Sequence, residues 1–441
     1  MARQPRGQAL VFLLPLLAAL AAAAWWALET GQAVTEKQRL RDAADAAALS
    51  GAVWQARSLN FQSTMNRAII ANEAVIAQSV SLRSWSAYMD RMLPGAAAVT
   101  AYVPYLNAAT SALQRWWTAF DRALQPSLVA LEATTGAVER DLAMAARVMH
   151  AATPLVVPQV VRETVAAADP RFRLSEGGEA MLAAWAAGWA RYASFYGGAW
   201  RWRQQDVVYR SLDGFTAERN FTLSPLLGSR LLRFEKRAGT ELIGFETWRG
   251  LDTLSLHQPR YVIFGPMRER VPLAWAGAEH GVGSARRGVH GGAWSRNPRS
   301  SRGAQGSVQP QRAWLGLPSM YDLSAAQRAA HEPPRIAVRL RLDAAARRGA
   351  ASLLGSDRVV RASGETVPLA GAVRGAPGDF YADAVASSDF ERPERRRDGA
   401  VELPSLYSPY WRSGLVASTA VERAAMALID GTPTWLAAVP R

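Results

Sequence analysis

The strongest constraint on this chain is an apolar run near its N-terminus. Twenty consecutive residues, from Ala9 to Leu28, contain no charged or strongly polar side chain. At a rise of about 1.5 Å per residue, a helix of this length spans ~30 Å, the thickness of the hydrocarbon core of a bilayer. A buried helix of a soluble domain normally carries a polar face, which this run lacks. We therefore predict a transmembrane helix from Ala9 to Leu28, with the lipid bilayer as a partner.

The flanks of the run predict its orientation. Arg3 and Arg6 precede it, and basic residues favour the cytoplasmic side of a membrane. Trp25 and Trp26 lie at its other end, where indole rings act as anchors at the membrane interface. We expect a single-pass protein of the inner (cytoplasmic) membrane, with a cytoplasmic N-terminus and its bulk in the periplasm or another extracytoplasmic space.

Three fates of the N-terminus remain open at this point. The first is retention of the apolar run as a membrane anchor. The second is cleavage near Trp25 as a secretory signal, for which the "AAAA" before Trp25 offers small residues, although the run exceeds the ~7 to 15 residues usual for such a signal. The third is cleavage between Gly7 and Gln8, as in prepilins, which would leave the helix on the mature protein.

A second helical segment follows the apolar run. From about Gly31 the chain has no proline for some thirty residues and is dominated by Ala and other helix formers, so we expect the helix to continue after a weak point at Gly31. Small residues form a candidate helix-packing face on this segment that permits close backbone approach. We weigh two interpretations equally: this face packs on the chain's own domain, or it contacts another molecule. The face comprises Ala43, Ala47, Ser50 and Gly51.

The combination of "RGQALVFLLPLLAAL" with "KQRLRDAADAAALSGA" resembles the N-terminal region of the TadE/TadG-like proteins of the Tad (Flp) tight-adherence pilus apparatus. These are pseudopilin-like, membrane-anchored bacterial proteins, and the resemblance covers about fifty residues. It makes Gly7 and Gln8, at the start of the family's hydrophobic segment, a candidate processing site. The resemblance implies a structural or assembly component that acts through helix packing and protein contacts. Its partners would be other Tad pilus or secretion components.

Two features depart from the family pattern. Pilins and the smaller pseudopilins of this kind commonly carry Glu five residues after the processing Gly, where this chain has Phe12. Longer TadG-like proteins often carry a von Willebrand factor A domain with an Asp-x-Ser-x-Ser metal loop. Neither "DTLS" at Asp252 nor "DLS" at Asp322 has that spacing, so we transfer neither the domain nor its metal.

Composition and motifs argue against an enzyme. The absence of Cys excludes thiolate nucleophiles, disulfides and Cys-ligated zinc. The sequence has no G-x-S-x-G, P-loop, H-E-x-x-H or dinucleotide fingerprint, and its five histidines are far apart. We predict no catalytic residues, cofactor, metal or small-molecule substrate.

The positive charge is weak support for nucleic-acid binding. The net charge of +14 comes almost entirely from arginine, with Lys37 and Lys236 the only lysines, which points to coding bias. We therefore do not expect a nucleic-acid partner. The alternative function is a secreted or anchored hydrolase with an N-terminal export signal. It would need two carboxylates facing one cleft, and the candidates are Glu235, Glu241, Glu246 and Asp252.

The remaining pattern predicts an α+β protein: a transmembrane helix continuing into a helical region, then a strand-containing exterior domain with a long disordered loop. Within the helical region, Pro94 and Gly95 should end one helix, and polar residues such as Asn66 and Glu73 should form a solvated face or contact a neighbouring subunit. The expected parts are a cytoplasmic stub and transmembrane helix (1–30), a mainly helical TadG-like region (31–205), a strand-rich part (206–279), a flexible Gly/Ser/Arg-rich loop (280–334), and strands with a C-terminal tail and short helix (335–441).

Three local patterns complete the prediction. The stretch from Arg230 to Gly250 predicts two short strands joined at 237–240, where Gly239 could supply a positive φ. The stretch "RIAVRLRLD" from Arg335 alternates apolar and basic residues, which is typical of a half-buried strand. A short helix should begin at about Thr419.

Overall fold

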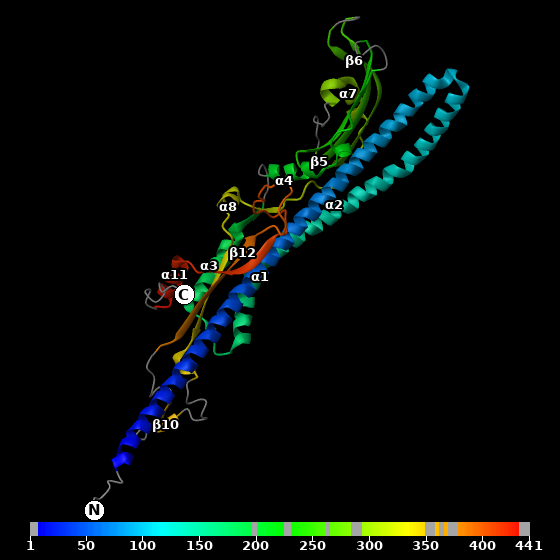
Figure 1. Ribbon diagram of the computed structural model, residues 1–441. Helices are drawn as coiled ribbons and strands as arrows, with labels where there is room; N and C mark the ends of the chain where they lie inside the picture. Colours follow the sequence, from blue (N-terminus) through cyan, green and yellow to red (C-terminus); the bar gives the residue numbers. More distant parts are fainter. Residues whose placement is uncertain are drawn as a thin grey trace, which may run out of the picture.

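The computed structural model describes residues 8–195, 201–224, 231–261, 265–283, 293–348, 358–360, 366–368 and 378–431. Figure 1 shows an elongated molecule with α1 (Gln8–Val99) as its spine and α2 (Pro104–Ala168) running back along it. The 3-10 helix η1 (Thr100–Tyr102) joins the two at the end opposite the N-terminus. The predicted α+β class, with a long N-terminal apolar helix followed by a strand-containing region, is confirmed.

Proline interrupts the helices less than the sequence predicted. The predicted helix end at Pro94 and Gly95 is wrong, because both residues lie inside α1, which continues to Val99. Gly31 does not break α1 either. The two antiparallel helices pack against each other, and this packing compensates for the single backbone hydrogen bond that a proline removes.

A five-stranded sheet packs on the half of α1 farther from the N-terminus. Its strands lie in the order β3-β4-β5-β6-β7, antiparallel except for the parallel β6–β7 pair. The strands are β3 (Phe221–Leu223), β4 (Arg233–Ile243), β5 (Thr247–Pro259), β6 (Met267–Gly281) and β7 (Pro310–Gln311).

The turn between β4 and β5 lies later than predicted. Gly239 is an ordinary strand residue paired with Leu251, so the predicted turn at 237–240 is wrong. The chain reverses at Gly244 and Phe245, whose φ angles are 62° and 64°. Consecutive left-handed residues match the twist of a tight hairpin, and Gly244 adopts this conformation without strain.

A four-stranded antiparallel sheet packs on the half of α1 nearer the N-terminus, in the order β1-β9-β12-β13. On β9, the predicted apolar face of Ile336, Val338, Leu340 and Leu342 is fully buried. On the opposite face, Arg339 is buried beside Asp383 and Asp430, whereas the side chain of Arg341 is 42% exposed. The half-buried prediction is therefore confirmed at Arg341 and wrong at Arg339. The strands are β1 (Arg173–Leu174), β9 (Arg335–Leu342), β12 (Phe380–Phe390) and β13 (Trp411–Val416).

Short elements complete the described fold. Thr419 caps α11 (Ala420–Ile429) through a capping box with Glu422, at the predicted helix start. The others are α3 (Glu176–Tyr192), α4 (Trp202–Ser211), α5 (Gly214–Ala217), α8 (Ala325–Ala330), η4 (Ala344–Ala346) and the strand pairs β2 (Ala193–Phe195) with β8 (Tyr321–Leu323) and β10 (Arg358–Val360) with β11 (Thr366–Pro368).

The segment 280–334 is more ordered than its composition predicted. Residues 284–292 lie outside the described part, but α6 (Ala293–Arg296) and α7 (Pro298–Gly306) follow them, and α7 packs on β5 and β6. Ser300 donates from its backbone N and its Oγ to Glu269 Oε1, at 2.9 and 2.8 Å. The small, polar side chains of α7 therefore allow close packing on the sheet and satisfy the buried carboxylate of Glu269. The prediction of a flexible loop is wrong for α7.

Candidate membrane anchor and interaction surfaces

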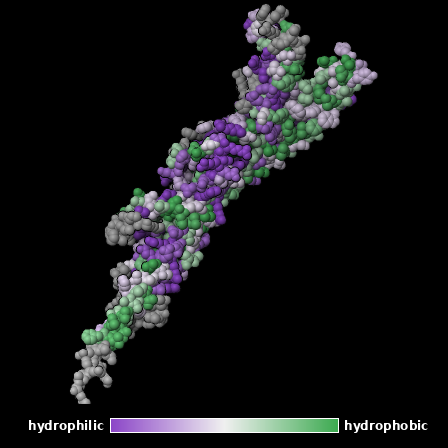
Figure 2. Space-filling view, in the orientation of Figure 1, coloured by the Kyte–Doolittle hydropathy of each residue, from purple (hydrophilic) through white to green (hydrophobic). Residues whose placement is uncertain are grey.

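The first turns of α1 extend free of the rest of the molecule. Phe12, Leu14 and Leu20 are each more than half exposed, and Trp26 is 72% exposed. Figure 2 shows this hydrophobic surface at the end of the molecule near the N-terminus. Within the part of the chain that the structure describes, α1 is the one helix long and apolar enough to cross a membrane. Such a contiguous apolar surface is stable in lipid and costly in water.

The residues at the two ends of the predicted span differ in their surroundings. Trp26 is exposed as an interface anchor should be, whereas Trp25 is only partly exposed. Gln8 is the first residue of α1. Gly7 and the side chains of residues 8–11 lie outside what the structure describes, so the candidate processing site and the start of the span at Ala9 stay predictions.

The small-residue face of α1 packs within the chain. Ala43 and Ala47 are buried in a cluster with residues of α2 and β9. A Cβ atom at Gly51 would lie 3.0 Å from Val161 Cγ2 and 3.2 Å from Ile336 Cδ1, so this glycine permits close approach. Ser50 remains partly exposed. Of the two interpretations, intramolecular packing describes Ala43, Ala47 and Gly51.

Polar residues farther along α1 are buried, which the sequence did not predict. Asn66 is inaccessible to solvent and donates from Nδ2 to Tyr321 O and Leu406 O, at 2.8 and 2.7 Å. Glu73 is equally buried and accepts from Trp248 Nε1 at 2.7 Å. The prediction of a solvated face is wrong for these two residues, because their partners come from segments distant in the sequence.

A second buried glutamate lies beside Glu73. Glu139, on α2, accepts from Trp314 Nε1 at 2.9 Å. Burial raises the pKa of the Glu139 carboxyl, and the neighbouring Glu73 carboxylate raises it further. Thus Trp248 donates to Glu73 on α1, and Trp314 donates to Glu139 on α2. No local sequence signal marks this pair, because each member follows an ordinary helical pattern.

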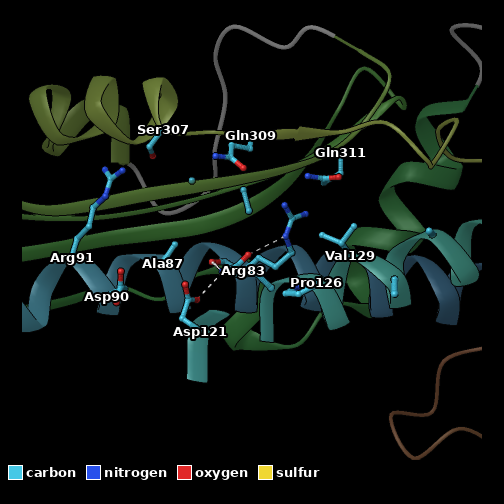
Figure 3. Close-up of a pocket in the computed structure, with 15 residues that line it drawn as sticks. Arg83, Ala87, Asp90, Arg91, Asp121, Pro126, Val129, Ser307, Gln309 and Gln311 are labelled. Atoms are coloured by element: carbon cyan, nitrogen blue, oxygen red, sulfur yellow. Dashed lines mark hydrogen bonds between the residues drawn. The ribbon is translucent and has the colours of Figure 1, made fainter. Parts of the chain in front are cut away.

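A polar cleft of about 680 Å³ separates the helical hairpin from β6 and the segment leading to β7 (Figure 3). Its charged side chains are already paired. Arg83 Nη1 lies 2.9 Å from Glu132 Oε2, and Asp121 Oδ1 accepts from Ser86 Oγ and Gln125 Nε2 at 2.5 and 2.9 Å. Among the described lining residues no free acid, base and nucleophile converge, so the cleft offers no recognisable catalytic arrangement.

The carboxylates proposed for a hydrolase do not face one cleft. Asp252 is fully buried and lies 2.7 Å from Lys236 Nζ and 2.9 Å from Arg219 Nη2. Burial opposes its ionisation, but the charges of Arg219 and Lys236 outweigh this and lower the pKa of Asp252 to about 2. Glu235 is likewise buried, 3.2 Å from both Arg233 and Arg237. These ionised, buried acids stabilise the sheet and are not accessible to a substrate.

The other two candidate acids are isolated from this pair. Glu241 lies opposite Arg249 in the β4–β5 ladder, and Glu246 is exposed beyond the turn. Among the described residues, no group of three or more His, Asp or Glu side chains is placed to hold a metal ion. The geometry therefore does not favour the hydrolase alternative.

Comparison with known proteins concerns the N-terminal segment. Residues 7–56 match the family described as "Putative Flp pilus-assembly TadE/G-like". This segment is TadE/G-like. The match covers the exposed apolar segment and the small-residue face, and it confirms the resemblance inferred from these residues. None of the curated proteins and none of the solved structures matches this chain.

Proposed function

We propose that the protein is a membrane-anchored, pseudopilin-like structural or assembly component of a Tad/Flp-type pilus. The TadE/G-like match at residues 7–56 carries this proposal. The family implies a structural role and contacts with other Tad components. The exposed apolar start of α1 fits a membrane anchor, and the arginines before it favour an inner-membrane location with a cytoplasmic N-terminus.

The mechanism is physical rather than chemical. Because α1 is one helix from Gln8 to Val99, the membrane segment continues directly into the helix on which both large sheets pack. The helix therefore holds both sheets at fixed distances from the membrane. An exposed apolar face on α2, formed by Met144, Val148 and Leu155, provides a surface on which a helix of another Tad component can pack.

The anchor is tested by N-terminal sequencing and intact-mass measurement of protein from washed membranes. A start at Met1 or Ala2 is expected for a signal-anchored assembly factor, and a start at Gln8 for a processed subunit that can enter a fibre. A start near Trp25, with the protein in the soluble fraction, would contradict membrane anchoring.

The partner contact is tested by photo-crosslinking in cells that assemble the pilus. A photoreactive amino acid at Val148 should give adducts with other Tad components, identified by mass spectrometry. The same amino acid at Glu163, exposed on α2 but outside the apolar face, is the matched control. Equal adducts at both positions, or normal pilus assembly in a strain lacking this chain, would refute the proposed role.

A further inference from the structure

The tip of the helical hairpin is a second exposed apolar surface, at the end of the molecule opposite the N-terminal segment (Figure 1). The twenty-three residues from Met92 to Gln114 include no charged residue. Tyr102 and Tyr105 are 92% and 91% exposed, and Val99 and Leu106 are more than half exposed. Figure 2 shows hydrophobic surface at this tip. No other described element covers these side chains.

Several hydrogen bonds at the tip form within the hairpin itself. The backbone N of Val103 donates to Thr100 O, and the N of Asn107 donates to Val103 O, both at 2.9 Å. Pro104, at the start of α2, has no N–H to satisfy. The hydroxyls of Thr100 and Thr110 lie 2.8 Å apart, and Thr110 also donates to Leu106 O. These bonds reduce the number of polar backbone groups that would enter lipid without a partner, although α2 has no side-chain cap at Val103.

The length of the uncharged tip matches one leaflet of a bilayer. Arg91 precedes Val99 by eight residues, and Arg115 follows Pro104 by eleven. At ~1.5 Å per residue, the uncharged helices extend about 12 to 16 Å, close to half of a ~30 Å hydrocarbon core. Arg91, Arg115 and the exposed Trp116 would then lie at the depth of the head groups, where arginine and tryptophan are favoured.

A basic surface lies at the same end of the molecule. The far ends of β5 and β6 carry Arg260, Arg268 and Arg270, all exposed, together with exposed Tyr261. The acid between Arg268 and Arg270 is Glu269, which is buried and accepts a hydrogen bond from Ser300, so its carboxylate is not exposed at this surface. Figure 1 shows the end of β6 and the tip of the helical hairpin as two separate projections at one end of the molecule. Exposed arginines on the first projection complement an anionic lipid surface that an apolar tip on the second can enter.

We propose that this distal end docks on a lipid surface, with the 92–114 tip inserted into one leaflet and Arg260 and Arg268 beside its anionic head groups. The membrane that holds the N-terminal segment cannot be the target. Leu28 and Val99 are seventy-one residues apart on one helix, which corresponds to about 107 Å. The protein would therefore bridge two apposed membranes. Docking of the tip does not rest on the pilus role, whereas the bridge rests on the membrane anchor proposed above.

The chain has no Cys, so a single introduced cysteine carries a unique label. Full-length Tyr105→Cys, labelled with the environment-sensitive dye NBD, is placed in phosphatidylcholine nanodiscs through its N-terminal segment. Vesicles of phosphatidylethanolamine and phosphatidylglycerol are then added. A blue shift and a severalfold rise in NBD emission are expected. Ala151→Cys, exposed on α2 far from the tip, should show no change with the same vesicles.

Variants separate insertion from charge attraction. Val99→Asp with Leu106→Asp should abolish vesicle binding. Leu155→Asp places the same charge on the exposed apolar face of α2, away from the tip, and should leave vesicle binding intact. Arg260→Glu with Arg268→Glu should weaken binding severalfold, with the largest loss at low salt. All five positions are exposed, so folding is preserved and is checked by circular dichroism.

Two results would overturn the proposal. NBD emission at position 105 that stays water-like with every vesicle composition would exclude insertion. A blue shift that needs no vesicles and grows with protein concentration would identify a second copy of the chain as the occupant instead. Either result leaves the proposed pilus role untouched, because crosslinking at Val148 tests that role separately.

Discussion

Two stretches of α1 meet the rest of the chain through different chemistry. From Leu40 to Ala52, which we call the apolar seam, alanines and Gly51 pack on α2 and β9. From Glu73 to Ser86, the polar seam, buried charges and hydroxyls meet α2, β4, β5 and β6. Arg83 Nη1 and His280 Nδ1 lie 2.9 and 2.8 Å from Glu132 Oε2, and Ser84 Oγ donates to Asp252 Oδ2 at 2.7 Å.

The two seams differ in what they specify. Alanines repeat along the apolar seam, so sliding the helix by one turn would replace one small side chain by another at similar cost. In the polar seam the same slide would leave buried charges without partners, which costs far more than an imperfect apolar contact. We infer that the apolar seam sets how closely α1 approaches and that the polar seam fixes its register.

The largest effect should come from breaking the polar seam. Asp252→Ala leaves Lys236 and Arg219 buried without their shared acid, and we expect a loss of about 3 to 5 kcal/mol. Urea denaturation of the solubilised full chain, with hydrogen exchange of β5 as a local probe, measures this loss. The matched control Asp141→Ala, at an exposed site, should change stability by no more than about 0.5 kcal/mol. Equal losses for Asp252→Ala and Asp141→Ala would show that the buried charges do not stabilise the packing of the polar seam.

A smaller effect should come from overfilling the apolar seam. Ala47 is fully buried, so Ala47→Leu forces α1 away from α2 and β9 and should cost about 1 to 3 kcal/mol. The neighbouring Ala46 is exposed, and Ala46→Leu is the matched control, with no expected loss. The same denaturation assay compares them. A tolerated Ala47→Leu would mean that this face is loosely packed and free to meet another helix.

The pH dependence of stability tests the acid pair that borders the polar seam. The pKa of Glu139 is higher in the folded chain than in the unfolded one. The stability that the protonated Glu139 carboxyl gives the folded state is therefore fully present below the unfolded pKa of 4.5 and is lost as the pH rises toward the folded pKa. Glu139→Gln keeps an acceptor for Trp314 and removes this loss. We expect the variant to gain about 1 to 2 kcal/mol over the native chain between about pH 5 and pH 8.

Thermal melts at several pH values measure this gain. The control Glu163→Gln alters an exposed acid and should leave the pH profile unchanged. If Glu139→Gln instead destabilises the fold at every pH, Glu139 is ionised in the native state and the assignment is incorrect.

The smallest effect should come from an exposed ion pair beside the apolar seam. Arg162 on α2 makes a bidentate contact with Glu179 on α3, at 3.0 and 2.7 Å, but both side chains are substantially exposed. Arg162→Ala should cost less than about 1 kcal/mol and should lose its effect at high salt. A salt-independent cost would point to packing of the arginine stem.

Prediction from sequence succeeded where the signal is local. The apolar face of β9, the start of α11 at Thr419 and the free apolar start of α1 each follow from residues adjacent in the chain. It failed where partners are distant. Glu73 looked solvated because Trp248 lies far along the chain, and α7 looked like a loop because Glu269, which its Ser300 satisfies, lies on another element.

The sequence by itself determined the long apolar segment from Ala9 to Leu28, the TadE/G-like character of residues 7–56 and the periodicity of the main helices, because hydrophobicity and helical period are properties of neighbouring residues. Only the tertiary structure decided which polar residues are buried, where the acids find their cations and which apolar surfaces stay uncovered. The physical reason is that burial and charge pairing depend on which elements pack together. The 92–114 tip and the polar seam therefore became recognisable only after the chain had folded.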